Sequence, residues 1–396
     1  MRKIILIILD GLGDRPIEQY GGMTPLEYAF TPNMDRLAKN GICGLMDVME
    51  GKTPESDEAH LTLFGYNLKK YYTGRGPIEA LGVGMNLMRG DIALRANLAS
   101  VDKNLIVIDR RTQRIRSTKE FVEAVNKMEI DGVKFFLKPG TEHRAVIVMR
   151  GENLNDKISD SDPHKVGVKV KKVRPLNESK NAKFTASVLN KFLAKSHEIL
   201  NNLEINKKRI EKGLLPGNYF LTRGAGHFRP VPSFKRKYGM KACCIAGAGL
   251  YKGIGKLVGM SLINLPGATG SVRTDIRGKF IAAKKAIKKF DFVFVHVKGC
   301  DIFGHDGNFE GKRHFIEKID KAMQVLLGID VPIVITADHS TPCECKGHSN
   351  DPVPLLISGP GIRPDTVKNF GERYCKFGTL GKLKGKEFMK KIMEIA

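Results

Sequence analysis

The sequence predicts an α/β fold: a doubly wound, mostly parallel sheet with an inserted smaller α+β domain. Residues 4–9 form a continuous apolar run, which is typical of a strand buried on both faces. Similar runs recur at residues 290–297, 331–336 and 353–357, and residues 315–327 have apolar side chains at helical spacing. Strands that alternate with helices favour a doubly wound sheet. The middle of the chain instead mixes short alternating stretches with a long polar helical pattern.

This change of pattern predicts a discontinuous domain organisation. Residues 1–66 and 229–396 are expected to form one catalytic domain, and residues 67–228 an inserted domain. The insertion carries 31 lysines and arginines against 17 aspartates and glutamates, so it holds much of the formal net charge of +24. We expect it to bind an anionic substrate.

Composition narrows the class of protein. An excess of positive charge favours anionic partners, and phosphorylated small molecules fit it as well as nucleic acids do. Nucleic-acid binding is the less favoured alternative, because the 396 residues contain no tryptophan and no known base-reading motif. No apolar run approaches the roughly 20 residues of a membrane span, so we expect no membrane partner. Seven scattered cysteines without an export signal favour reduced thiols and a cytoplasmic location, and a homo-oligomer stays open.

Acidic residues and histidines lie where the predicted strands end. Functional side chains collect at the carboxyl ends of the strands in open parallel sheets, so these residues are expected to share one site. Aspartate with histidine suits manganese or zinc, and oxygen ligands suit magnesium. Any one of them alone is more often an ordinary polar residue, but the whole set suffices for two divalent ions. The candidates are Asp10, Asp301, His305, Asp338, His339 and His348.

Two cysteines offer a second kind of metal site, a zinc knuckle, at the same place. Cys343 and Cys345 lie close to His348, but one residue separates them instead of the two to four usual for structural zinc. A zinc knuckle is therefore not favoured.

Ser56 is the candidate nucleophile. Thr53 suits an N-cap and Pro54 the first helical position, which would place Ser56 in the first turn of a helix. Free N–H groups at a helix start favour a bound phosphoryl group. A serine at a helix start is usually only a cap. The hypothesis that Ser56 is a nucleophile therefore depends on the candidate metal ligands, whose ions would activate it.

Basic side chains of the insertion are candidates for substrate binding. Arginine binds phosphate and carboxylate bidentately, and a histidine can orient a hydroxyl or carboxylate group. No P-loop or dinucleotide fingerprint is present to offer another phosphate site. The candidates are Arg110, Arg111, Arg144, His164 and Arg223, followed by Arg75 and Arg95.

Several short motifs resemble a known family. They lie at residues 9–16 (LDGLGDRP), 31–35 (TPNMD), 56–61 (SDEAHL), 74–77 (GRGP), 304–308 (GHDGN) and 337–342 (ADHSTP). On these motifs, which span nearly the full chain, the sequence resembles the archaeal type of 2,3-bisphosphoglycerate-independent phosphoglycerate mutase, within the alkaline phosphatase superfamily. The resemblance implies an alkaline phosphatase-like catalytic domain that binds two metal ions.

The resemblance also implies roles for residues. It makes Ser56 the residue that becomes phosphorylated and Lys252 a nearby charge stabiliser or acid. One ion, typically manganese, zinc or magnesium, would be held by Asp301, His305 and His348, and the other by Asp10, Ser56, Asp338 and His339.

The implied activity is an isomerisation, the interconversion of 3-phosphoglycerate and 2-phosphoglycerate in glycolysis and gluconeogenesis, without 2,3-bisphosphoglycerate. The alternative is a metal-dependent phosphatase or another phosphomutase of the superfamily, because a fold does not determine a reaction. The family pattern Pro-Gly-Ser-Asp-Thr-Ala-His becomes PESDEAH at residues 54–60, so Glu55 and Glu58 add negative charge beside the nucleophile. If they face an anionic substrate, we expect a lower rate or a weaker affinity.

Overall fold

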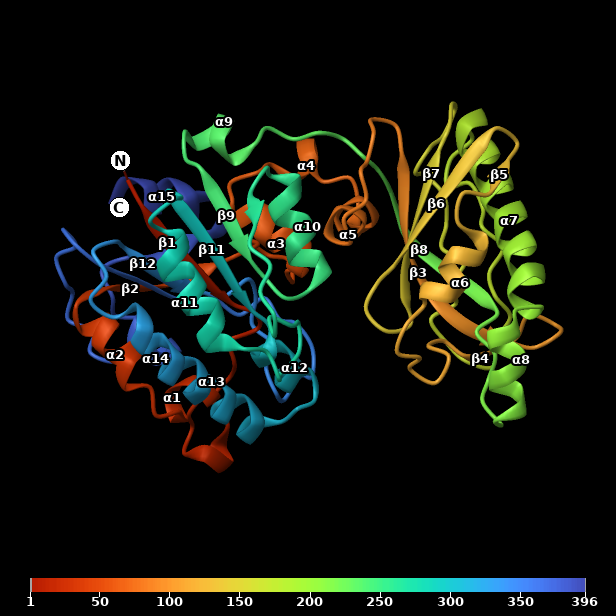
Figure 1. Ribbon diagram of the computed structural model, residues 1–396. Coiled ribbons are helices and arrows are strands. Elements are labelled where there is room, and N and C mark those ends of the chain that lie inside the picture. The colour runs from red at the N-terminus through yellow and green to blue at the C-terminus, as the bar shows by residue number, and fades with distance from the viewer. Residues whose placement is uncertain (1, 396) are drawn as a thin grey trace. The chain divides into compact units, whose positions relative to one another are not determined.

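The computed structural model describes residues 2–395 and divides into two compact units. The first unit consists of Met1–Tyr72 and Pro232–Ala396, and the second of Thr73–Val231 (Figure 1). The sequence predicts the two domain boundaries at residues 66/67 and 228/229. These positions lie six and three residues before the boundaries between the two units, at residues 72/73 and 231/232. Their two outermost residues, Met1 and Ala396, lie outside the described residues.

An eight-stranded sheet forms the centre of the first unit. Its strands follow the order β10-β9-β11-β1-β12-β13-β2-β14. Their bounds are β1 Ile4–Leu9, β2 Gly41–Asp47, β9 Ala242–Ile245, β10 Ser261–Leu262, β11 Phe292–Val297, β12 Ile333–Thr336, β13 Val353–Ser358 and β14 Gly381–Lys384. Every residue of β1, β11, β12 and β13 is buried, as the continuous apolar runs predict.

The sheet is mixed. Strands β10, β9, β11, β1 and β12 run parallel, and β14 is parallel to β2. Strand β13, whose apolar run resembles those of the parallel strands, is antiparallel to both β12 and β2. The cause is the connection from β12 to β13, which contains no helix. A parallel return usually requires a helical crossover, whereas a chain that turns back without one pairs antiparallel.

Helices of the first unit pack in two groups. Helices α2, α11 and α13 pack together, with α2 on β13 and β2 and α11 on β11 and β9. Helices α3 and α10 contact each other, and Phe64, directly after α3, meets Phe292 and Phe294, which share one face of β11. The bounds are α1 Pro25–Tyr28, α2 Pro32–Lys39, α3 Ser56–Leu63, α4 Leu68–Tyr71, α9 Phe234–Tyr238, α10 Gly249–Leu257, α11 Ile276–Ala286, α12 Gly299–His305, α13 Phe309–Met323, α14 Glu372–Cys375 and α15 Phe388–Ile395, with 3-10 turns at Glu18–Tyr20, Gln324–Leu326 and Gly385–Glu387.

The second unit is built on a largely antiparallel sheet with helices beside it. Strands follow the order β4-β3-β7-β6-β5, and β8 pairs with β3. The long polar pattern forms two helices, α7 and α8, in place of one, and α7 packs on β8 and β5. The bounds are β3 Ile92–Val101, β4 Val107–Asp109, β5 Glu129–Ile130, β6 Val133–Pro139, β7 Arg144–Arg150, β8 Tyr219–His227, α5 Arg75–Gly82, α6 Lys119–Val125, α7 Lys180–Asn201 and α8 Glu204–Glu211.

The seven cysteines are all free thiols. Within residues 2–395, none of the helices combines the length and the apolarity needed to cross a bilayer.

Candidate active site

Three adjacent parallel strands end side by side in the first unit. Strand β1 lies between β11 and β12, with Leu9 opposite Val297 and Ile8 opposite Thr336. The residues that follow these ends are Asp10, Lys298 and the pair Asp338–His339. Because the strands are parallel, all of these side chains start from the same edge of the sheet.

The first candidate metal group, here the His305 group, consists of Asp301, His305 and His348. Asp301 and His305 occupy successive turns of α12, and His348 lies in the loop between β12 and β13. Asp301 Oδ1 is 3.3 Å from His305 Nε2 and 3.4 Å from His348 Nε2. The ligand atoms of the three residues all lie within 4.8 Å of one another.

The second group, here the His339 group, consists of Asp10, Asp338 and His339. His339 Nε2 lies 3.5 Å from Asp10 Oδ1 and 3.4 Å from Asp338 Oδ2, and all three side chains are buried. Ser56 Oγ is 3.3 Å from the same Nε2 atom. The two groups are neighbours, since the rings of His339 and His348 stack with their centroids 3.7 Å apart.

The chemistry of the donor atoms fits metal ions. Each of the three histidines has its Nδ1 atom hydrogen-bonded to an oxygen, which assigns the proton of the neutral ring to Nδ1 and leaves Nε2 as a lone pair. The acceptors are Thr341 Oγ1 for His339, the Lys346 carbonyl for His305 and the Pro54 carbonyl for His348. Each Nε2 atom then faces a carboxylate oxygen, and such a contact requires either a proton or a metal ion between the two atoms.

Unpartnered buried atoms support the same conclusion. Asp10 Oδ1 and Asp338 Oδ2 have no hydrogen-bond partner although they are buried, and a bound cation would satisfy both. His60 and His296 can be grouped with Asp338, and their Nε2 atoms are also unpartnered. Other contacts hold these two rings, because His60 Nδ1 bonds to the Ser56 carbonyl and His296 stacks on Tyr251.

The surroundings shift the pKa values of these groups in different directions, and the Asp301 carboxylate raises the pKa values of His305 and His348. Burial opposes ionisation of Asp301, but hydrogen bonds from His305 and His348 hold the pKa of its carboxyl well below the usual range. Burial, assisted by the neighbouring Asp10 carboxylate, raises the pKa of Asp338. Burial lowers the pKa of His339 to about 4, so this ring is neutral near pH 7, which is the form that binds a metal ion.

Ser56 is the first residue of α3, and its side chain is buried. The helix was expected to begin at Pro54, and this is wrong by two residues. The backbone of Glu55 is extended, so Glu55 is the N-cap residue of the helix. The Pro54 carbonyl, just before it, accepts a hydrogen bond from His348 Nδ1. Glu55 is exposed, and Glu58 forms an ion pair with Lys52. The charge of Glu58 is therefore already balanced.

Lys298 is an important residue that our sequence analysis missed. Its ammonium group donates to Asp301 Oδ2 at 2.7 Å, and to Asp10 Oδ2 and the Tyr251 hydroxyl at 3.2 Å each. Burial opposes its charge, but Asp10 keeps the pKa of Lys298 well above the usual value. Its position directly after a buried strand, like that of Asp10, was the available signal. Lys252, on α10, donates to Asn264 Oδ1 at 3.1 Å, and within residues 2–395 no hydrogen bond joins it to Ser56.

Most of the expected substrate residues gather in the second unit. Arg95 on β3 lies opposite Arg223 on β8, and Arg75 and Arg95 share the carboxylate of Glu79 at 3.2 and 3.4 Å. Burial and the charges of Arg75, Arg223 and Arg144 lower the pKa of Arg95 to about 10. Crowded cations of this kind favour an anionic ligand.

The guanidinium group of Arg110 donates two hydrogen bonds to the buried carboxylate of Asp162, at 3.1 and 2.7 Å. His164 lies beside this pair and donates its backbone N–H to Asp162. Arg111 is exposed, and its backbone N–H donates to Asp109. The structure therefore brings Arg110 and His164 together.

Two buried nitrogen atoms without a hydrogen-bond partner lie among the arginines of the second unit. Arg223 Nε is buried without a hydrogen bond, and burial and nearby arginines lower the pKa of this guanidinium. His143, which sequence analysis also missed, is 4% exposed and its Nδ1 atom has no hydrogen-bond partner. Burial and the charges of Arg144 and Arg111 lower the pKa of His143 to about 4.

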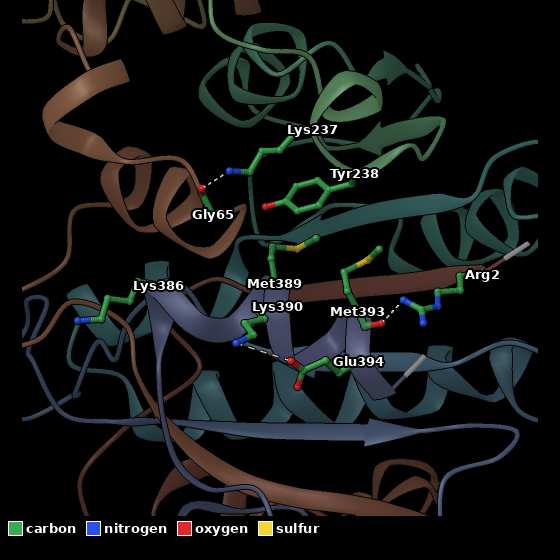
Figure 2. Close-up of a pocket in the computed structure, with 9 residues that line it drawn as sticks. All are labelled: Arg2, Gly65, Lys237, Tyr238, Lys386, Met389, Lys390, Met393 and Glu394. Atoms are coloured by element: carbon green, nitrogen blue, oxygen red, sulfur yellow. Dashed lines mark hydrogen bonds and ion pairs between the residues drawn. The ribbon is translucent and has the colours of Figure 1, made fainter.

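A separate pocket of about 680 Å³ lies elsewhere on the first unit (Figure 2). Several basic side chains line it, but they already have partners. Arg2 donates to the Met393 carbonyl, Lys237 to the Gly65 carbonyl, Lys390 pairs with Glu394 and Lys386 with Glu50. None of the candidate residues lies in this pocket.

Comparison with known proteins agrees with this geometry. A family model described as 2,3-bisphosphoglycerate-independent phosphoglycerate mutase matches residues 38–206. Curated enzymes of that name from Methanocaldococcus jannaschii and Archaeoglobus fulgidus are 47% and 46% identical to the chain; they cover 99% and 98% of it, and the matches include 97% and 96% of their own lengths. The chain belongs to the 2,3-bisphosphoglycerate-independent phosphoglycerate mutases. The family resemblance expected from the motifs is thereby confirmed.

Solved structures agree with this membership. The cofactor-independent phosphoglycerate mutase of Thermoplasma acidophilum is 38% identical, with full coverage of both chains and a TM-score of 0.73. A protein from Pyrococcus horikoshii is 37% identical over all of this chain and 97% of its own, with a TM-score of 0.85. Membership of this mutase family, together with the two candidate groups, indicates the use of divalent metal ions.

Proposed function

We propose that the chain interconverts 3-phosphoglycerate and 2-phosphoglycerate without 2,3-bisphosphoglycerate, through a phosphorylated Ser56. The observation that carries this proposal is the place of Ser56 Oγ, 3.3 Å from His339 Nε2 and at the first residue of a helix. Backbone N–H groups at that helix start favour a phosphoryl group on the serine. Membership of the mutase family supports the same reaction.

The metal groups support this chemistry. We propose that Asp301, His305 and His348 hold one divalent ion, and that Asp10, Ser56, Asp338 and His339 hold the other, with manganese, zinc or magnesium as the candidates. Bound ions would neutralise phosphoryl charge and lower the pKa of a coordinated hydroxyl group. The alkaline phosphatase-like, doubly wound character of the first unit belongs to this proposal.

The chain's own residues account for the transfer. Ser56 Oγ forms a bond to phosphorus while the bond between phosphorus and the 3-oxygen breaks, which leaves phosphoserine and glycerate. The 2-hydroxyl of glycerate then bonds to the same phosphorus, and Ser56 is released. Glycerate must stay bound between the two transfers, because its loss would turn the enzyme into a phosphatase.

We propose that the second unit binds substrate and excludes water as a lid. Arg110, Arg144 and Arg223, with Arg75, Arg95, Arg111 and His164, are the proposed substrate residues. The mutual lowering of arginine pKa values supports an anion partner there, and phosphoglycerate carries both a phosphate and a carboxylate. Lys252 is proposed to assist Ser56 as a charge stabiliser or acid. The expected partner is therefore a small molecule, and the free cysteines support a cytoplasmic location.

The test is an enolase-linked assay of metal-stripped and Mn²⁺-loaded protein, without added 2,3-bisphosphoglycerate. We expect metal-dependent production of 2-phosphoglycerate in the wild type and its loss in Ser56→Ala. Ser233→Ala is the matched control, because Ser233 also begins a helix of the first unit, where it caps α9. Mass spectrometry of quenched enzyme should show the phosphate on the peptide that contains Ser56. Release of inorganic phosphate as the main product would instead favour a phosphatase of the same superfamily.

A further inference from the structure

Lys298 contacts one carboxylate from each candidate metal group. Its Nζ atom is 2.7 Å from Asp301 Oδ2, in the His305 group, and 3.2 Å from Asp10 Oδ2, in the His339 group. The Tyr251 hydroxyl, which donates to the same Asp10 oxygen, lies 3.2 Å from Nζ. The ammonium therefore binds between two residues that are separated by 291 positions in the sequence.

Each of these carboxylates divides its two oxygen atoms between different partners. Asp301 Oδ1 faces His305 and His348, whereas Oδ2 faces Lys298. Asp10 Oδ1 faces His339 and has no hydrogen-bond partner, whereas Oδ2 faces Lys298. Lys298 thus does not occupy the oxygen of either carboxylate that faces the histidines of the two candidate groups. Other contacts reach these carboxylates too, because Thr341 Oγ1 donates to Asp301 Oδ1 at 2.9 Å and His296 Nε2 lies 3.0 Å from Asp10 Oδ2.

We infer that Lys298 is a resident cation of the metal site, which stabilises Asp10 and Asp301 when no ion is bound and limits how tightly the two ions bind. This inference rests on the proposed two-metal function. Two buried carboxylates that share one counter-ion would repel each other without it, and a single ammonium group bound to Oδ2 of both reduces that repulsion. The same positive charge repels a divalent ion bound close by, so it lowers metal affinity.

The two effects predict a distinctive result for the variant Lys298→Met. Without metal, the variant should melt at a lower temperature than the wild type, because Asp10 and Asp301 lose their shared counter-charge. Its affinity for Mn²⁺ should rise by about tenfold or more, because a charge a few ångströms from a divalent ion contributes more than the roughly 1.4 kcal/mol that a factor of ten represents. A residue that served only to pack the site would lower affinity when removed.

The experiment is titration calorimetry of metal-stripped protein with Mn²⁺, accompanied by melting curves with and without the ion. Lys298→Arg keeps the charge and should retain an affinity within about threefold of the wild type, an allowance for the different geometry of the guanidinium group. Lys279→Met is the matched control, because buried Lys279 donates to the His296 carbonyl and not to a carboxylate. We expect it to leave Mn²⁺ affinity unchanged.

An unchanged or weaker Mn²⁺ affinity in Lys298→Met would overturn the inference. So would a gain of affinity in Lys298→Arg as large as that in Lys298→Met, because charge would then not be the cause. The readout is independent of turnover. If wild-type protein binds two Mn²⁺ ions but does not convert phosphoglycerate, the proposed function fails while the role of Lys298 is still tested.

Discussion

The two units of the molecule crowd together charges of opposite sign. The first unit buries the carboxylates of Asp10, Asp301 and Asp338 beside histidines that are hydrogen-bonded through Nδ1. The second crowds arginines around Arg223 and His143, and their positive charges depress one another's pKa values. Each arrangement is costly alone, because like charges repel where water cannot screen them. The difference teaches that the sign of the charge in excess at a crowded site indicates the ligand: a cation for the first unit and an anion for the second.

Metal removal should give the largest effect and should distinguish the units. At a Mn²⁺ concentration about 1,000 times the dissociation constant, binding stabilises the folded state by about 4 kcal/mol. We expect chelation to remove that protection from amides of β1, β11 and β12 and to leave β3 and β7 unchanged. Hydrogen exchange followed by mass spectrometry measures both regions in one sample. Equal losses in both units would break the comparison.

Replacing Arg223 should have the next largest effect, and it should act on substrate binding. Loss of a hydrogen bond to a charged group costs about 1.5–3 kcal/mol, so Arg223→Met should raise KM for 3-phosphoglycerate by roughly ten- to a hundredfold. The melting temperature of the free protein should not fall, because the variant removes a crowded cation whose Nε atom has no partner. Exposed Arg174 supplies the control Arg174→Met, for which no change in KM is expected. A fall in stability with an unchanged KM would show that Arg223 is structural.

His143 should make the second unit sensitive to acid. Its pKa is lowered to about 4 in the folded state, from an ordinary value of 6.5. The unfolded chain therefore takes up a proton that the folded chain refuses, so stability is present above pH 6.5 and is lost as the pH falls toward 4. His143→Gln should reduce the loss of stability between pH 7 and pH 4.5 by about 2 kcal/mol. Urea unfolding at the two pH values, followed by a probe in the second unit, tests this. An acid sensitivity equal to that of the wild type would assign the loss to other groups.

The smallest effect is expected from replacing Glu58. The variant tests whether a carboxylate outside the two candidate metal groups also affects the binding of an anionic substrate. Because Glu58 pairs with Lys52, whose side chain is 56% exposed, the pair contributes no more than about 1 kcal/mol. Glu58→Thr should therefore change KM for 3-phosphoglycerate by less than about threefold. Steady-state kinetics at two salt concentrations would measure it. A KM lowered tenfold would show that this carboxylate opposes the substrate after all.

Sequence reasoning located the candidate ligands because the signal was local. A buried strand is a continuous apolar run, and the polar residue after it marks the strand end, so Asp10 and Asp338 could be found without a structure. The direction of β13 could not be found in this way. Its apolar run resembles that of a parallel strand, and only the helix-free connection before it makes the pairing antiparallel.

Contacts across the sheet were not predictable from the sequence. Tyr251 and Lys298 meet Asp10 only because α10 and the end of β11 lie next to the end of β1, and no spacing in the chain encodes that proximity. Arg223 and Arg95 became neighbours through the register of β8 on β3. The sequence therefore predicts which charged side chains the two sites contain, but not which of these side chains contact one another.

The central place of β1 has a consequence for synthesis of the protein. Ile4 pairs with Phe292, so β1 obtains its neighbours only after almost 300 further residues have been added. At roughly 5–20 residues per second that interval lasts on the order of 15–60 s, during which the second unit is completed while the segment IILIIL remains unpaired. A free apolar strand of this kind promotes aggregation. Until the last third of the chain has been made, this apolar segment is therefore without the two strands that cover its edges in the finished sheet.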